Sequence, residues 1–420
     1  MNKNNSIYKN EINNLNNFNH LSYSSYNMQN LRSRYTSSDT KKNILKNNLA
    51  QKNLNGQKKK RRYQNGCIGL LNLGNTCFLN SALQNLKNVF ILTKYLFEIK
   101  DFYTNGFAQK YLYLLANLIN QENIQFYSPK ELYSKLLEKS SIFQSGQQND
   151  STFAIIIIIN LLEKELKDKK IKNANDFQEL INNNNLNIEE KRKLYSFLDK
   201  ILNKKDQKIF EIFYGFNENI IQCKNCKKKN FSFQTFNVLN LPIIKKNNDK
   251  IINLEDAINY YQEKQNNKNN CQFNCCINNN IEIQTKIIGL PKILIINFKR
   301  VGELSFYNHK IKIDINLEMG KLIYNKNYFN YNYELIGFIN HLGNEYSGHN
   351  IAFCKNFFDN NWYQYNDSIV KNINVNDIPK EAESNGFLFF YKMKGIDITD
   401  DEKKNLINIA DQIRKKNINI

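Results

Sequence analysis

A change of pattern near residue 209 constrains the fold of this chain more than any other feature of its sequence. Before it, apolar residues recur mainly with helical spacing, and after it short apolar runs alternate with Asn-rich loops in the manner of strands. Helices followed by strands, rather than the two in alternation, predict an α+β fold. The chain has 420 residues, 41% of them hydrophobic, which is enough to bury a core without disulfide staples.

The expected elements can be placed by residue range. The helical patterns cover Cys77–Leu86, Tyr111–Ile119, Pro129–Leu137, Phe153–Leu166 and Ile188–Leu202. The strand-like runs cover Phe231–Leu241, Ile293–Phe298, Tyr333–Ile339, Ile351–Phe353, Trp362–Tyr365 and Phe387–Tyr391. The longest apolar run, Ala154–Ile159, is too short to span a bilayer, so no membrane role is expected.

The two ends of the chain differ from its middle. Residues 1–65 are rich in Asn, Ser and Lys and have no sustained period, which predicts a disordered basic tail. Residues 1–66 carry 13 Lys and Arg against two acidic residues, so 11 of the net 20 positive charges belong to this region. The rest of the chain is only mildly basic, and a nucleic-acid partner is not expected. Residues 394–420 are predicted to form a charged helical extension.

Cellular location is predicted from three features. The opening residues lack the apolar stretch of a signal peptide, and the eight cysteines are too unevenly placed for a secreted disulfide scaffold. The cluster Lys58–Arg62 is of the nuclear-import type, although a solvated charge run beside a domain boundary would look the same. We therefore expect a soluble protein of the cytoplasm, the nucleus or both.

Cys77 is the first candidate for chemistry. Gly74 and Asn75 permit a tight turn, after which Cys77 opens an amphipathic helix, and the positive end of the helix dipole favours the reactive thiolate. Asn72, on the loop before the turn, can direct its amide N–H toward an oxyanion beside the backbone N–H of Cys77. A lone cysteine after such a turn is more often structural, so the neighbouring sequence has to decide.

The segment Gly69–Leu86 closely resembles the cysteine box of the ubiquitin-specific protease family. A second resemblance follows downstream, where Tyr333–His341 and Gly348–Phe353 are similar to the histidine box of that family. There a strand ends, a loop follows, and Gly-His opens the next strand. By this match His349 is the general base, whereas His341 lies on the other side of the loop.

A third segment, Trp362–Val370, is similar to the stretch that follows the histidine in the family, where Asn or Asp comes after an aromatic residue. The match implies that Asn366 orients His349 and that Asp367 is a helper that polarises the oxyanion site. Asp367 as the orienting residue is the alternative. The order Cys77, His349, Asn366 is that of papain-like proteases.

The middle of the chain supplies candidate metal ligands. Phe210–Pro242 resembles the entry into the family's "fingers" and contains Cys223-x-x-Cys226, with Cys271, Cys275 and Cys276 following. Four thiolates complete a closed tetrahedral Zn²⁺ site of the structural kind. The predicted ligands are Cys223, Cys226, Cys271 and Cys275, with Cys276 the alternative to Cys275. A site that has lost its metal is the other interpretation.

One departure from the family concerns the substrate. Gln147–Phe153 is similar to a family segment whose two acidic residues would meet the arginines of the ubiquitin tail. Asn149 and Thr152 stand at those two positions here, and Asp150 is displaced by one residue. Asn350 replaces the aromatic residue that usually follows the histidine. Weaker tail binding, or preference for another modifier, is expected.

The resemblance extends over residues 66–393 and implies a papain-like cysteine protease fold. A helical thumb, a β-sheet palm and zinc-bearing β fingers at about residues 215–300 would hold ubiquitin. The implied reaction is hydrolysis of the isopeptide bond after the modifier's terminal glycine, with no cofactor for catalysis. The alternatives are a catalytically weak ubiquitin-binding scaffold, a protease for another ubiquitin-like modifier, and a basic zinc-ribbon nucleic-acid binder.

Overall fold

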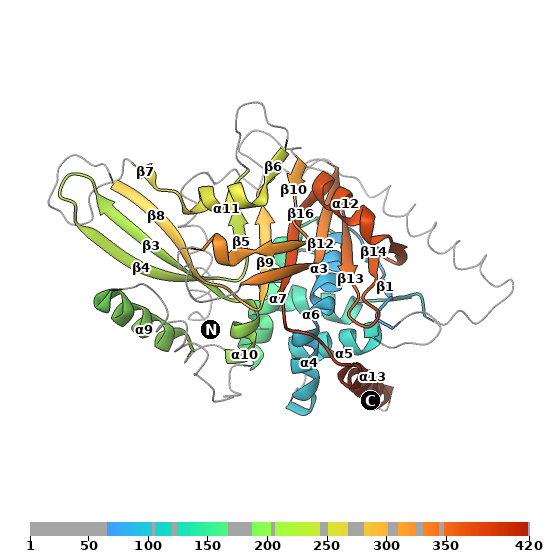
Figure 1. Cartoon of the computed structure of the whole chain (residues 1–420). Helices are drawn as coiled ribbons and strands as arrows, with labels where there is room; N and C mark the ends of the chain where they lie inside the picture. Colours follow the sequence, from blue (N-terminus) through green and yellow to red (C-terminus); the bar gives the residue numbers. More distant parts are fainter. Residues whose placement is uncertain are drawn as a thin grey trace. The chain divides into compact units, whose positions relative to one another are not determined.

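Two large β-sheets, two short two-stranded sheets and a group of helices make up the part of the chain that the structure, a computed structural model, describes (Figure 1). The described residues are 65–102, 106–119, 124–166, 187–202, 206–243, 251–267, 281–300, 310–323, 331–343 and 348–418. All of them belong to one compact unit. The predicted tail before Asn65, its basic cluster, and Cys271, Cys275 and Cys276 lie outside these ranges.

The first half of the chain is mainly helical. Its helices are α3 (Cys77–Asn88), α4 (Phe90–Glu98), α5 (Phe107–Ile119), α6 (Lys130–Lys139), α7 (Ser151–Leu166), α9 (Ile188–Leu202) and α10 (Gln207–Phe213). Helix α3 packs against α4 and α7. Every residue of α3 is buried, including its polar ones. Its buried amides bond instead of facing water; Gln84, for example, donates to the carbonyl oxygen of Ile68 at 2.8 Å. The helix that begins at Cys77 therefore lies inside the core.

The larger sheet has the strand order β15-β14-β13-β12-β16-β9-β5, with β11 paired to β12. Its strands are β5 (Leu239–Leu241), β9 (Ile293–Phe298), β11 (Asn316–Glu318), β12 (Asn332–Gly343), β13 (Gly348–Lys355), β14 (Trp362–Asn366), β15 (Ile369–Ile373) and β16 (Gly386–Met393). Both faces are buried at β9, because Ile293 and Ile295 join the helical core while Leu294 and Ile296 join a second core. Alternate residues thus tie the sheet to two apolar layers.

The smaller sheet has the order β4-β3-β8-β7, all antiparallel. Its strands are β3 (Gly215–Cys223), β4 (Lys229–Phe236), β7 (Gln265–Asn267) and β8 (Ile281–Gly289). Within the range predicted for the fingers, about 215–300, β3, β4, β7 and β8 form this sheet, whereas β5 and β9 belong to the larger sheet. β5 pairs in parallel with β9, and β9 pairs with β16, so both strands extend the larger sheet.

Shorter elements complete the described fold. They are β1 (Gly69–Leu70) paired with β2 (Phe126–Tyr127), β6 (Ile251–Asn253) paired with β10 (Lys310–Lys312), and the helices α11 (Leu254–Gln262) and α12 (Ile378–Asn385). Most helices precede residue 214 and most strands follow it, which confirms the α+β prediction. No helix within the described ranges is both long enough and apolar enough to cross a membrane.

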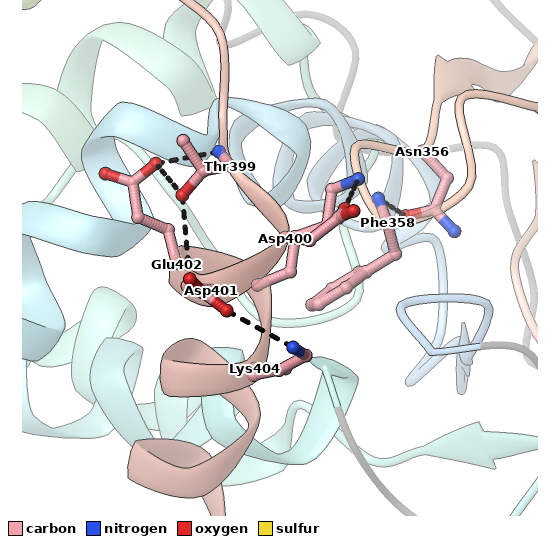
Figure 2. Close-up of polar contacts among 8 residues, drawn as sticks. Asn356, Phe358, Thr399, Asp400, Asp401, Glu402 and Lys404 are labelled. Carbon is pink, nitrogen blue, oxygen red and sulfur yellow. Dashed lines mark hydrogen bonds and ion pairs between the residues drawn. The ribbon is translucent and has the colours of Figure 1, made fainter.

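The C-terminal helix α13 (Asp400–Ile418) packs on α5. Leu406, Ala410 and Ile413 are buried in the helical core, so this charged segment is tied to the domain. Its first turn is closed by a capping box, in which Thr399 N–H donates to Glu402 and Glu402 N–H donates back to the Thr399 hydroxyl (Figure 2). The two bonds measure 2.8 and 3.2 Å.

Candidate active site

Cys77 is the first residue of α3 and is 5% exposed. The turn before it uses two left-handed residues, Gly74 at φ 103° and Asn75 at φ 56°. The side-chain oxygen of Asn72 accepts the backbone N–H groups of Gly74 at 2.9 Å and Thr76 at 3.1 Å. This side chain therefore holds the turn that delivers the thiol to the helix start, as Asn does in turns of this kind.

His349 and Asn366 come from neighbouring antiparallel strands, β13 and β14. Nε2 of His349 lies 2.6 Å from the side-chain oxygen of Asn366. A hydrogen bond with Cys77 raises the pKa of His349 to about 9, with burial opposing the rise and the bond to Asn366 adding to it. The thiol, the imidazole and the amide, which are far apart in sequence, are brought together in one line of contacts.

Asp367 lies beside Asn366 in the chain but serves other partners. It occupies the two-residue turn between β14 and β15 with φ 50°, and its carbonyl oxygen accepts the N–H of Leu70 at 2.8 Å. Its carboxylate accepts one amide N–H from Asn72 at 2.9 Å and another from Asn80 at 2.7 Å. His349 thus bonds Cys77 and Asn366, whereas the Asp367 carboxylate bonds two asparagines.

Gly69 explains how this turn approaches the loop that carries Asn72. A Cβ at Gly69 would lie 2.5 Å from the carbonyl oxygen of Ser368 and 2.8 Å from that of Asp367. Only glycine permits such a close approach of β1 to the β14–β15 turn. The glycine that opens the cysteine motif thus brings two distant parts of the chain into contact.

The residues predicted to read the substrate tail lie at the start of α7. Asp150 caps this helix, because its carboxylate accepts the backbone N–H of Thr152 at 2.6 Å. Thr152 is 5% exposed, and the side-chain oxygen of Asn149 accepts the N–H of Asp150 at 3.2 Å. Gln148 donates to the carbonyl oxygen of Gly348 at 3.1 Å, so this segment contacts the strand that begins with Gly-His.

Asn350, where the family pattern has an aromatic residue, contacts the other histidine of the box. Its side-chain oxygen lies 2.9 Å from Nδ1 of His341, across the β12–β13 pair. Asn350 is buried. Asn350, in place of the aromatic residue, therefore links β12 and β13, the two strands on either side of the loop.

Half of the predicted zinc site falls within the described residues. Cys223 is buried at the end of β3, and Cys226 follows in a turn where Lys227 has φ 59°. The N–H of Cys226 donates to the Cys223 sulfur at 3.5 Å. A tight Cys-x-x-Cys turn of this kind fits two thiolate ligands of one metal. Among the described residues no group of three or more His, Cys, Asp or Glu is clustered for a metal, and the other predicted ligands lie outside them.

Asn80 contacts the site although the sequence motifs did not assign it a role there. The sequence held no clear signal, because Asn80 is one of several polar residues on this helix. Its partner Asp367 is 287 residues away, which no local pattern can reveal.

Comparison with known proteins identifies a family that the chain matches. The family model described as Ubiquitin carboxyl-terminal hydrolase matches residues 68–391. Human Ubiquitin carboxyl-terminal hydrolase 2 is 24% identical over 344 residues, which cover 78% of this chain and 55% of the human protein. Usp2 of Drosophila melanogaster is 24% identical over 374 residues, covering 85% of this chain and 38% of the fly protein. The chain thus spans about half the length of the human relative, and less of the fly protein.

Two solved structures have the same fold. The yeast SAGA DUBm with a mutant Sgf73 superposes with a TM-score of 0.61 at 21% identity, covering 84% of this chain and 76% of that chain. The SAGA Ubp8/Sgf11/Sus1/Sgf73 DUB module bound to ubiquitin aldehyde gives a TM-score of 0.60 at 20% identity, covering 85% and 76%. Helix α13 lies beyond the residues that the family model matches.

Proposed function

Because the chain belongs to the ubiquitin carboxyl-terminal hydrolase family, with the motifs of its ubiquitin-specific proteases, we propose that it is a thiol-dependent deubiquitinase. Its substrates are protein conjugates of ubiquitin, and it cleaves the isopeptide bond after the modifier's terminal glycine. The observation that carries this proposal is the set of contacts from Cys77 through His349 to Asn366. That set supplies a nucleophile, a base and an orienting amide.

The proton movements follow from the hydrogen bonds of His349. The side-chain oxygen of Asn366 can only accept, so Nε2 carries a proton and Nδ1 faces the thiol. Nδ1 takes the proton of Cys77, and the thiolate forms a bond to the carbonyl carbon of the glycine. His349 then returns the proton to the lysine amine as the C–N bond breaks. Water attacks the remaining thioester with His349 as base and releases the carboxylate.

The negative oxygen of the tetrahedral intermediate needs donors. The backbone N–H of Cys77 is one, at the positive end of α3. The amide nitrogen of Asn72 carries two hydrogens, of which one bonds Asp367, so the other is directed to the oxyanion. The carboxylate of Asp367 polarises this amide and fixes its plane.

A ubiquitin probe with a C-terminal electrophile tests the proposal. The wild-type protein should form a covalent adduct, and Cys77→Ala should lose it while retaining reversible binding. Cys354→Ala is the matched control, because Cys354 is also a buried free cysteine but lies outside the line of contacts at Cys77. Reversible binding by the wild-type protein without any adduct would instead support a catalytically weak scaffold.

The choice of modifier rests on Asn149 and Thr152. Neither is charged, and Asp150 is engaged as a helix cap, so the site offers the tail arginines little negative charge. Neutralising those arginines in ubiquitin should therefore reduce kcat/KM by less than about 10-fold, and Asn149→Asp should increase the penalty. Comparing fluorogenic ubiquitin with ubiquitin-like substrates tests the remaining possibility, that a relative of ubiquitin is the preferred modifier.

A structural Zn²⁺ is the cofactor we propose, held by Cys223, Cys226, Cys271 and either Cys275 or Cys276. The turn at Cys223 and Cys226 supports it, since its backbone N–H to sulfur bond suits a pair of thiolates. When bound, the metal would link the turn of Cys223 and Cys226 to the segment that carries Cys271 and take no part in hydrolysis.

We further propose a location in the nucleus, the cytoplasm or both, with Lys58–Arg62 as the import signal. A fluorescent fusion in which these five residues are replaced by alanine should shift toward the cytoplasm. A distribution that does not change would remove the signal from the proposal.

A further inference from the structure

Asn80 lies on α3 one helical turn after Cys77 and is 2% exposed. Its amide nitrogen is 2.7 Å from Oδ1 of Asp367, 3.3 Å from the carbonyl oxygen of Leu71 and 3.4 Å from that of Leu70. Leu70 and Leu71 directly precede Asn72. One buried amide on the helix of the nucleophile therefore contacts both the loop that carries Asn72 and the turn that carries Asp367.

The two oxygens of the Asp367 carboxylate are held by different amides. Oδ1 accepts from Asn80, and Oδ2 accepts from Asn72. The carboxylate is consequently fixed in one plane, since rotation about its χ2 angle would break both bonds. The other end of the Asn72 side chain is fixed as well, by the N–H groups of Gly74 and Thr76.

We propose that Asn80 is a positioning residue, which aims Asn72 at the oxyanion by fixing the Asp367 carboxylate. The proposal rests on the deubiquitinase function above and adds a residue to its mechanism. Asn80 does not touch the substrate. It acts through Asp367. Because Asn80 and Cys77 lie on the same helix, α3, the bonds of Asn80 hold the Asn72 amide in a fixed direction relative to the nucleophile. An oxyanion donor is effective only when it is oriented before the reaction begins.

The chemistry of the side chain fits this role. An amide nitrogen has two hydrogens, enough for the carboxylate and for the adjacent carbonyl oxygens of the loop. Aspartate at this position would place a second negative charge against Asp367, and an apolar residue would leave one carboxylate oxygen without its donor.

The first test compares Asn80→Ala with Gln84→Ala in hydrolysis of a fluorogenic ubiquitin substrate. Gln84 is the matched control. It lies on the next turn of α3, is 1% exposed, and donates to the backbone carbonyl oxygen of Ile68 rather than to Asp367. We expect Asn80→Ala to lower kcat by about 10- to 100-fold with KM nearly unchanged, as loss of an oriented oxyanion donor does. Gln84→Ala should lose thermal stability to a similar degree and keep kcat. Equal losses of kcat in the two variants would overturn the proposal.

A double-mutant cycle shows whether Asn80 acts through Asn72. If it does, the variant that combines Asn72→Ala with Asn80→Ala should have a kcat within about 3-fold of Asn72→Ala alone. Losses that multiply would mean that the two residues act independently, and the proposal would then be wrong. The isosteric Asn80→Asp serves if the alanine variant does not fold: it should lower kcat at least about 10-fold relative to wild type, and wild-type kcat would contradict the role.

A measurement that needs no turnover separates this proposal from the proposed function. In a crystal structure of Asn80→Ala, the amide of Asn72 should leave its 2.9 Å contact with Asp367. An unchanged contact overturns the positioning role even in an active enzyme. An inactive wild-type protein would refute the deubiquitinase proposal, and the displaced Asn72 would still support the arrangement described here.

Discussion

Asn366 bonds the ring of His349 at 2.6 Å, while the adjacent Asp367 turns its carboxylate away to two asparagines. The two side chains diverge because of the backbone. Asn366 is the last residue of β14, whereas Asp367 lies in the hairpin turn with φ 50°. Asn366 therefore contacts the proposed general base, His349, whereas Asp367 contacts the proposed oxyanion donor, Asn72.

Replacing Asn366 by alanine should lower kcat by about 10- to 100-fold, because the imidazole would lose the bond that fixes its orientation and tautomer. Asn361→Ala is the control, since Asn361 is an exposed asparagine just before β14 whose side chain bonds the carboxylate of Asp359, away from His349. NMR titration of His349 adds an independent check: Asn366→Ala should reduce its pKa more than Asp367→Ala does. The reverse order would make Asp367 the orienting residue.

The raised pKa of His349 predicts how stability depends on pH. Its hydrogen bond with Cys77 is the largest cause of the rise from 6.5 to about 9, so the folded protein binds this proton more tightly than the unfolded chain. The stabilisation is fully present below pH 6.5 and is lost as the pH rises through about 9. Urea unfolding of wild type and Cys77→Ala should give free energies that differ most below pH 6.5 and converge above pH 9. A difference independent of pH would argue against the Cys77–His349 bond.

Zinc content is expected at about one equivalent per chain, as for a closed site of four thiolates. Cys223→Ala should lose the metal and lower the unfolding temperature, whereas Cys67→Ala, at another buried cysteine, should keep the metal. Metal analysis of Cys275→Ala and Cys276→Ala, made separately, identifies the fourth ligand as the position whose loss releases zinc. Purified wild-type protein without zinc would favour a site that has lost its metal.

Thr399→Ala should destabilise the protein by about 1 kcal/mol in urea unfolding, because it removes the cap that closes the first turn of α13. Asp401→Ala is the control: the Asp401–Lys404 pair is exposed on the same turn and should contribute less than about 0.5 kcal/mol. Equal effects would indicate that α13 is held by its charges rather than by its cap and its buried residues.

Much of the fold was predictable where periodicity and composition agree. The prediction Ile188–Leu202 coincides with α9, Ile293–Phe298 coincides with β9, and Phe153–Leu166 falls two residues short of α7. Helix α4 was missed because its sequence, FILTKYLFE, is apolar on nearly every side and has no clear period. Helix α11 follows an Asn- and Lys-rich stretch whose composition predicts a loop.

Motifs in the sequence single out candidate residues of the site but do not show which of them contact one another. The family resemblance names Asn366 as the residue that orients His349 and leaves Asp367 as the alternative, because sequence patterns do not show that Asp367 adopts a positive φ. The partner of Asn80 is set by how β1 meets the β14–β15 turn, a contact that depends on the packing of the whole domain.

Asn72 and Asp367 lie 295 positions apart in the chain, and this separation has a consequence for synthesis. A ribosome completes the helix of Cys77 long before it makes His349, so the growing chain carries the thiol without the base that would activate it. A chain that terminates before β13 would therefore lack the proposed general base. If the proposed function holds, the order of the chain delays activity until nearly all of the domain has been synthesised.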